Sequence, residues 1–73
     1  MIILQKWLIE QRKAKNLSLE QLADRLNKPF SYVHDVENGQ YQLDVVEYLF
    51  YCKALDINPN HGIELIQSNL TSI

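Results

Sequence analysis

The chain has 73 residues, of which 47% are hydrophobic and 22% charged, and this composition is typical of one small globular domain and excludes a disordered one. The single cysteine, Cys52, excludes an internal disulfide and a multi-cysteine zinc site, and no hydrophobic run approaches the roughly 18 residues that span a bilayer. Residues 1–28 carry six basic and three acidic side chains, whereas residues 29–73 carry one basic and six acidic, which predicts two surfaces of opposite charge.

Hydrophobic spacing and helix-terminal residues predict five helices and no strands, an all-α fold. The first helix is expected from about Leu4 to Lys15, followed by Asn16, a residue that tolerates the left-handed conformation. The second follows Ser18, because its hydroxyl and the amide of Gln21 have the spacing of a capping box. The hydrophobic stripe of this second helix consists of Leu22, Ala23 and Leu26.

The third helix is expected to begin near Pro29, because proline is tolerated in the first turn of a helix but not inside one. It ends at about Glu37, where Asn38 and Gly39 supply the positive φ that stops a helix. Its inward-facing residues, spaced three apart, are Val33 and Val36.

The fourth helix is expected over residues 45–55, because Asp44 and Glu47 have the spacing of a second capping box. Its buried face is predicted to hold Val45, Tyr48, Leu49, Cys52 and Leu55. Val46 and Phe50 are expected on the exposed face, flanked by Tyr51 and Ala54. Cys52 is therefore interpreted as a core thiol and not as a nucleophile.

The fifth helix begins at Pro59, which again suits the first helical position, and it carries Ile63 and Ile66. After residue 67 the hydrophobic pattern fades into a polar segment. We therefore expect one domain over residues 1–67 and a frayed tail over residues 68–73.

Ser18 to Gly39 have the layout of a helix-turn-helix, with two short capped helices separated by a break of about four residues. Three segments, Leu17–Leu26, Ser31–Gly39 and Leu43–Pro59, resemble the Cro and phage-repressor family of helix-turn-helix regulators, the XRE-like proteins. The resemblance extends over about residues 4–66 without gaps. It implies a lambda-repressor-like five-helix bundle that binds operator DNA as a symmetric dimer.

The resemblance also implies roles for individual residues. Base edges in the major groove would be contacted by Phe30, Ser31, Tyr32 and Asp35. DNA phosphates would be contacted by Arg12, Ser18, Lys28, Asn38 and Gln40. Arg12 would also form a structural ion pair with Glu37, since a carboxylate near DNA needs a cation to neutralise it. An alternative for Phe30 is that it fills the gap between the second and third helices.

The chain departs from the family pattern at three positions. Leu19 stands where many relatives have a glutamine that contacts phosphate, and Asp35 and Gln40 stand where basic residues are frequent. Residues 29–42 therefore contain no lysine or arginine. Phosphate neutralisation is expected from Arg12, Lys13, Lys15, Arg25 and Lys28. If three or four of these act in each subunit, the salt slope of a dimer would be roughly −5 to −7.

Val46 and Phe50 lie four residues apart and form an exposed hydrophobic stripe, which predicts a surface for a partner. In family terms the fourth and fifth helices often supply the dimer contact. We therefore assign Val46, Phe50, Ile63 and Ile66 to a homodimer interface. The alternative is that these residues are scattered over the surface without a role.

Together these features predict a sequence-specific DNA-binding transcriptional regulator, a repressor that reads a palindromic operator through its third helix. We expect it in the cytoplasm of a prokaryote, encoded by the chromosome or by a phage. No paired carboxylates, metal-ligand spacing or phosphate loop indicates an enzyme, a metal site or a cofactor. The alternative function is an antitoxin or protein-interaction module on the same fold, with weakened DNA binding and a protein partner.

Overall fold

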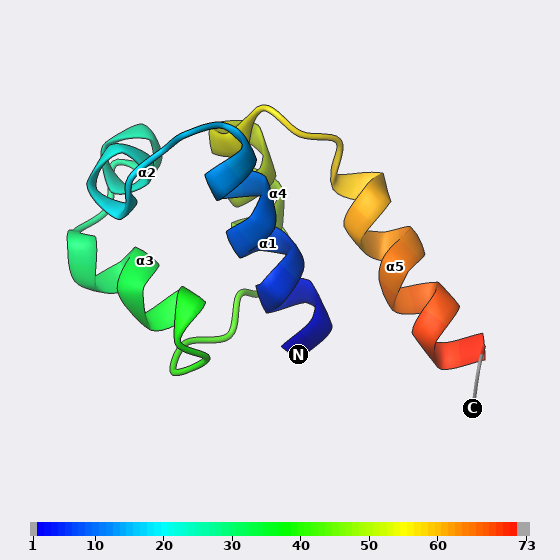
Figure 1. Ribbon diagram of the computed structural model, residues 1–73. Helices are drawn as coiled ribbons and strands as arrows, with labels where there is room; N and C mark the ends of the chain where they lie inside the picture. The colour runs from blue at the N-terminus through cyan, green and yellow to red at the C-terminus, as the bar shows by residue number, and fades with distance from the viewer. Residues whose placement is uncertain (1, 72–73) are drawn as a thin grey trace.

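The computed structural model describes residues 2–71, which form five helices and no strand (Figure 1). In chain order these are α1 (Ile2–Ala14), α2 (Leu19–Leu26), α3 (Phe30–Glu37), α4 (Val45–Leu55) and α5 (Pro59–Thr71). The predicted all-α fold is confirmed, and the starts of α2 and α4 fall where the capping residues predicted them. Within the described part of the chain, no helix has the length and hydrophobicity needed to cross a membrane.

Local polar contacts explain where α2 begins and ends. The Ser18 hydroxyl accepts a hydrogen bond from the Gln21 amide at 3.0 Å, and the Gln21 side chain accepts one from the Ser18 amide at 2.8 Å. Asp44 and Glu47 repeat this capping box at α4. Asn27 ends α2 with a φ of 55° in the left-handed region. These contacts satisfy some of the backbone groups left free at both ends of α2 and at the start of α4, which fixes the residues where these helix ends lie.

The end of α3 differs slightly from the prediction. Pro29 precedes the helix as its N-cap with extended backbone, and the first helical residue is Phe30. At the other end the positive φ belongs to Gly39 alone, at 77°, while Asn38 has a φ of −88°. A glycine at this position allows the chain to turn directly into the loop that leads to α4.

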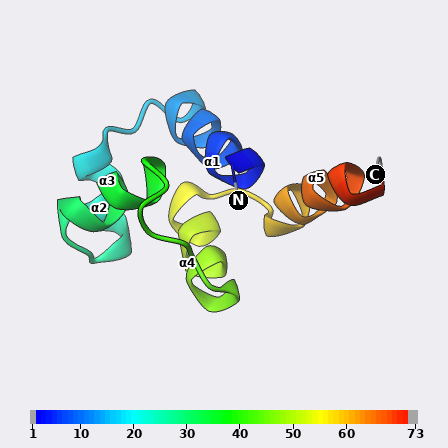
Figure 2. The same ribbon diagram turned by 90° about the horizontal axis from the view of Figure 1, so that it is seen from below.

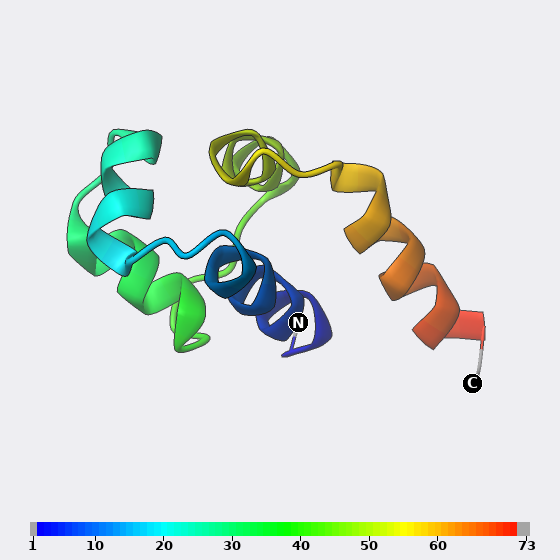
Figure 3. The ribbon, with the colours of Figure 1, turned by 45° about the horizontal axis from the view of Figure 1, so that its top comes forward.

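Helices α1 and α4 lie in the middle of the molecule, between the other three helices. Figures 1 and 2 show α2 and α3 on one side of α1 and α4, and α5 on the other. In contact terms α3 packs on α2 and α1, α2 also packs on α4, and α5 packs mainly along α1 (Figure 3). Because α3 lies at the outside of the bundle, one of its faces stays open to solvent.

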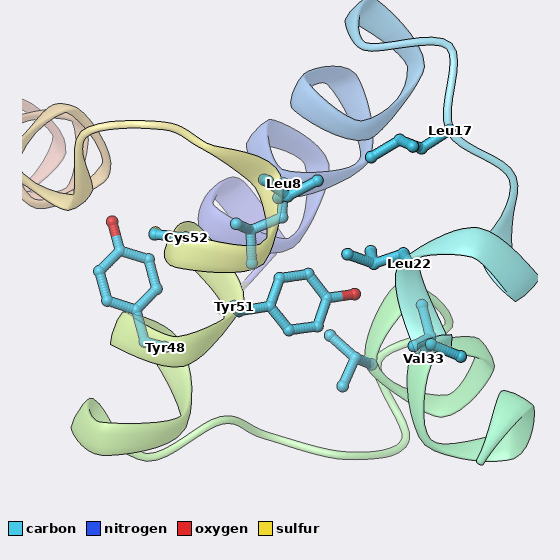
Figure 4. Packing of buried hydrophobic residues seen from close by; sticks show 10 residues of the cluster. Leu8, Leu17, Leu22, Val33, Tyr48, Tyr51 and Cys52 are labelled. Carbon is cyan, nitrogen blue, oxygen red and sulfur yellow. The ribbon is translucent and has the colours of Figure 1, made fainter. Parts of the chain in front are cut away.

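The core is formed by buried hydrophobic side chains from the first four helices and the segment before α2 (Figure 4). It consists of Leu8, Leu17, Leu22, Ala23, Val33, Val36, Tyr48, Tyr51, Cys52 and Leu55. The predicted burial of Val33, Val36 and Cys52 is confirmed. The Tyr51 ring reaches across the core towards Leu22, and its hydroxyl is buried without a hydrogen-bond partner among the described residues (Figure 4).

The predicted buried face of α4 was wrong in part. Val45 is 75% exposed and Leu49 is 46% exposed, while Tyr51 is fully buried. Hydrophobic residues occupy nearly every side of this helix, so their period does not select one face. The helix is rotated from the predicted orientation so that Tyr48, Tyr51, Cys52 and Leu55 face inward.

Helix α5 is held against α1 and α4 at Gly62, which is buried. A Cβ atom here would fall on the Tyr48 hydroxyl and within 2.9 Å of Cζ3 of Trp7, so only glycine allows this approach. The Tyr48 hydroxyl also donates to the carbonyl of Pro59 at 2.5 Å. The helix then continues to Thr71 through residues expected to be frayed, and residues 72–73 lie outside the described part.

Candidate nucleic-acid interface

The exposed face of α3 begins with an aromatic residue. Phe30 is 47% exposed, and its ring lies 5.9 Å from that of His34, one helical turn later. Ser31 is exposed and Asp35 is half-buried, with its carboxylate 3.6 Å from Nδ1 of His34. Val33 and Val36 hold the opposite side of the helix in the core. The helix therefore presents a row of one aromatic, one hydroxyl and one carboxylate side chain to solvent.

The end of α3 is fixed to α1 by an arginine. Nε of Arg12 donates to Oε2 of Glu37 at 2.6 Å, and Nη2 donates to Oε1 at 3.1 Å. The third donor, Nη1, binds the carbonyl of Leu17 at 2.6 Å, just before α2. The structure thus brings together Arg12 and Glu37, and one guanidinium joins the end of α3 to the start of α2.

Gln5 makes a contact at the same end of α3 that sequence reasoning missed. Its side-chain amide donates to the carbonyl of Glu37. Gln5, Leu8 and Arg12 follow each other at three- and four-residue spacing on α1, so the face of α1 turned towards α3 could have been found from its period. Gly39 packs on the Gln5 side chain, which keeps the turn after α3 close to α1.

Tyr32 has a different environment from its neighbours on α3. Its side chain is half-buried against the core, and its hydroxyl donates to Oε2 of Glu47 at 3.3 Å. Tyr41 donates to the same oxygen, and the two tyrosine rings lie 5.1 Å apart. Burial, followed by the Glu47 charge, raises the pKa of Tyr32 to about 12. The hydroxyl of Tyr32 therefore donates within the protein, and its oxygen can still accept a hydrogen bond.

Of the five residues assigned to phosphate contacts, Arg12 is largely enclosed, with its side chain 13% exposed. The other four are exposed: Ser18, Lys28, Asn38 and Gln40. Ser18 adjoins Leu17 and Asn38 adjoins Glu37, and Arg12 bonds to both of those neighbours. The start of α2 and the turn after α3 are therefore held next to each other. Lys28 lies beside the start of α3, with its ammonium 5.4 Å from the centre of the Tyr32 ring.

Two of the expected phosphate-binding cations are directed elsewhere. Nη1 of Arg25 donates to the carbonyl of Ala54 at 3.1 Å, and Nζ of Lys15 donates to the carbonyl of Asp56 at 3.4 Å. Both carbonyls belong to the last turn and C-cap of α4, where free carbonyl groups and the helix dipole favour positive charge. The sequence could not indicate this, because it does not show which helix end lies beside α2.

The exposed hydrophobic surface on α4 is larger than predicted. Val46 is 60% exposed and Phe50 is 62% exposed, and the exposed Val45 and Leu49 extend this surface along the helix. On α5 the side chain of Ile63 is 42% exposed. Ile66 is half-buried and lines a cavity between α1 and the loop after α3.

A groove runs beside this hydrophobic surface, between the end of α2, the start of α3 and α4. Val46, Phe50 and Leu26 form its hydrophobic lining, and Lys28 and Glu47 are among its charged residues. Among residues 2–71, no three His, Cys, Asp or Glu side chains are grouped to hold a metal ion. Cys52 is fully buried, and this burial raises the pKa of its thiol.

Comparisons with known proteins give a matching family model and similar solved structures. The sequence matches the helix-turn-helix family model over residues 8–61. An XRE-family like protein from Pseudomonas syringae pv. tomato has a similar structure, with a TM-score of 0.86 and 30% sequence identity, over 92% of this chain and 82% of that one. The restriction-modification controller protein C.AhdI from Aeromonas hydrophila is 39% identical with a TM-score of 0.76, over 84% of this chain and 92% of that one.

A comparison with curated protein sequences gives no significant match. The family match covers both helices of the motif as well as α4, and the two solved structures are similar over most of the chain. On these grounds the chain belongs to the XRE family of helix-turn-helix proteins, which are DNA-binding transcription regulators.

Proposed function

We propose that the protein is a sequence-specific repressor that binds a palindromic operator as a homodimer, with α3 in the major groove. The observation that carries this proposal is the position of α3. Its valine side is buried, its last residue is fixed by Arg12, and its Phe30–Ser31 end is open to solvent. Major-groove reading requires a helix that is held rigidly at the surface and whose first residues are free to contact base edges.

Within this proposal the exposed side chains of α3 have separate roles at base edges. Phe30 suits a thymine methyl group, and Ser31 suits a base edge that donates or accepts a hydrogen bond. The carboxylate of Asp35 accepts from the amino group of cytosine. Tyr32 acts indirectly, because its hydroxyl is bound to Glu47. Specificity is therefore proposed to rest on Phe30, Ser31 and Asp35.

Phosphate binding is proposed for the two segments on either side of Arg12. The first turn of α2 carries free amides behind Ser18, and Asn38 and Gln40 lie in the turn after α3. With Lys15 and Arg25 bound to α4, and the charge of Arg12 paired with Glu37, the cations left for phosphate are Lys13 and Lys28. One or two contacts in each subunit give a dimer a salt slope of roughly −2 to −4, shallower than the −5 to −7 expected from three or four contacts.

The hydrophobic surface of α4 is proposed as the centre of the dimer. Val46 and Phe50 leave more than half of each side chain exposed, and Val45 and Leu49 adjoin them on α4; Ile63 is a further exposed hydrophobic residue, on α5. A hydrophobic surface of this kind on a small domain is typical of an interface. Ile66 is half-buried within the protein and contributes at the edge. Phe50→Asp is expected to abolish the dimer, which sedimentation of the variant and the parent protein measures.

A second candidate function is an antitoxin or protein-interaction module with weakened DNA binding. Two observations favour it. Residues 29–42 contain no lysine or arginine, and the exposed surface of α4 would serve a different protein as well as a second copy. Under this alternative the protein partner covers Val46 and Phe50, and α3 contributes little to binding.

The test that separates these functions is selection of binding sites from random duplex DNA, followed by titration of the selected site at several salt concentrations. The proposal predicts a palindromic site, and Phe30→Ala and Ser31→Ala each lose about 5- to 150-fold in affinity for it, equivalent to 1–3 kcal/mol for each base-edge contact. Gln67→Ala, at an exposed position on α5, is the control and leaves binding unchanged. Enrichment of no site, or equal binding of all three variants, contradicts the proposal and favours the second function.

A further inference from the structure

The recognition helix packs mainly on helices other than the proposed dimer helix, α4. α3 packs on α2 and α1, and its core side chains Val33 and Val36 are enclosed there. Any influence of α4 on the orientation of α3 must therefore pass through side chains. Among the hydrogen bonds of the described residues, one carboxylate on α4 provides this connection.

That carboxylate belongs to Glu47, which binds three elements at once. Oε1 accepts the amide of Asp44 at 3.0 Å and so closes the capping box of α4. Oε2 accepts the hydroxyl of Tyr32 on α3 at 3.3 Å, and it also accepts the hydroxyl of Tyr41 in the loop between α3 and α4. Figure 1 shows this loop leaving the end of α3 and returning to the start of α4. One side chain thus joins the first turn of α3, the loop at Tyr41 and the start of α4.

The ionisation states of Glu47 and of the two tyrosines keep these hydrogen bonds in place at neutral pH. The hydrogen bonds from the Asp44 amide and the Tyr41 hydroxyl lower the pKa of Glu47, with a further contribution from Tyr32. The hydrogen bond to Glu47 raises the pKa of Tyr41. The carboxylate therefore stays ionised and accepts, while both phenols stay protonated and donate. Lys28 adds a positive charge above the Tyr32 ring.

Helix α3 is held by hydrogen bonds at both of its ends. Arg12 and Gln5 hold the last residue of α3 from α1, whereas Glu47 holds its first turn, through Tyr32, from α4. A helix fixed at one end alone can pivot about that end. Fixed at both ends, it has one orientation on the bundle. Glu47 also lies beside Val46 and Phe50 in the groove along α4.

We propose that Glu47 is a positioning residue for DNA reading, which sets the angle of α3 from α4 through the hydroxyls of Tyr32 and Tyr41. The inference rests on the proposed function, since it concerns how the same helix reads DNA. Binding of a partner to the hydrophobic surface of α4 then affects the orientation of α3 through this carboxylate. Through these two hydroxyls the cluster controls sequence preference, in addition to the stability that the Glu47 capping box gives α4.

The first test needs no DNA. Tyr32→Phe and Tyr41→Phe remove one hydroxyl each and keep the ring packing, and Tyr51→Phe makes the same change on α4 at a hydroxyl without a partner. The amide NMR signals of Ser31 to Asp35 should shift in the first two variants and stay in place in the control. In a Glu47→Ala background, Tyr32→Phe should cause no further shift, because the acceptor is already missing. Unchanged signals in both tyrosine variants overturn the proposal.

The second test measures the ratio of affinities for the selected operator and for unrelated DNA, at a temperature where every variant is folded. We expect Tyr32→Phe and Tyr41→Phe to lower this ratio by between about 2- and 30-fold, as for residues that couple to a site without touching the ligand. Tyr51→Phe should leave the ratio unchanged. A ratio that stays constant while the amide signals shift also overturns the proposal. If the parent protein selects no site, the proposed function fails, and the NMR test alone then decides whether Glu47 sets the orientation of α3.

Discussion

The ion pair between Arg12 and Glu37 can be tested by removing the arginine. Both side chains are largely enclosed, at 13% and 12% exposure, and Arg12 makes three hydrogen bonds at 2.6, 2.6 and 3.1 Å. Arg12→Met keeps the hydrophobic stem but leaves the Glu37 carboxylate without its cation and the Leu17 carbonyl without a donor. Breaking a buried pair in this way costs about 3–5 kcal/mol, and the remaining exposure favours the lower limit.

The magnitude is large for so small a domain. A chain of 73 residues has a free energy of unfolding of about 4–11 kcal/mol, so a loss of about 3 kcal/mol is about a quarter of the total or more. At about 4–8 °C for each kcal/mol in domains of this size, Tm should fall by about 12–24 °C. Lys13→Met is the matched control, since Lys13 is the next residue on α1 and is exposed. It should change the stability by less than about 0.5 kcal/mol.

The assay is urea unfolding followed by circular dichroism at neutral pH, with both single variants and the double variant. Glu37→Leu removes the carboxylate, so Arg12→Met combined with Glu37→Leu leaves no buried unpaired charge. The double variant should therefore be more stable than Arg12→Met alone, with a coupling energy of at least about 2 kcal/mol. A coupling energy below about 0.5 kcal/mol, the size found for pairs on the surface, would refute the reasoning.

Three further predictions concern stability. Tyr51→Phe should stabilise the protein by about 1 kcal/mol, because it removes a buried hydroxyl that has no hydrogen-bond partner among the described residues; a loss of stability in urea unfolding would show that the hydroxyl is bound. Gly62→Ala should destabilise it by about 1–2 kcal/mol, since a Cβ atom meets Tyr48 and Trp7 and this outweighs the gain in helix propensity of about 1 kcal/mol; a higher Tm would contradict this. Finally, all four tyrosines have raised pKa values, to about 12 for Tyr32. A pKa that is higher in the folded state gives stability that is complete below the unfolded value of about 10 and is lost as pH rises towards the folded value. Absorbance at 295 nm should therefore show tyrosine ionisation together with loss of helix between pH 10 and 12, and normal titration of a fully helical protein would disprove it.

The ends of the helices could be predicted because their signals are local. Ser18 with Gln21, and Asp44 with Glu47, lie three residues apart, and their side chains bind the amides that those helices leave free. Neither pairing depends on the rest of the fold. The buried face of α4 could not be predicted in the same way, since Val45 and Tyr51 are both hydrophobic and only packing against α2 decides between them.

The candidate site could also be predicted from the sequence only in part. The exposed position of Ser31 follows from the period of α3, once Val33 and Val36 are recognised as its core residues. Phe30 borders the buried face, and only packing determines that it is 47% exposed. The Glu47 cluster joins residues 32, 41 and 47, whose hydroxyl and carboxylate groups meet only when the loop folds back to α4. Sequence reasoning treated Glu47 as a capping residue alone, because its second oxygen has no local partner.

The use of Arg25 and Lys15 at the end of α4 has a consequence for how such a regulator would search a genome. Hydrogen bonds to backbone carbonyls leave both side chains charged, but they direct these cations to the end of α4 and leave fewer of them for direct phosphate contacts. The number of such contacts determines how many molecules are held at unrelated sites. Competing sites number about 10⁶ or more in a genome, so weaker retention leaves a larger share of molecules free to reach the operator. We therefore expect a regulator built in this way to occupy an operator at a low copy number.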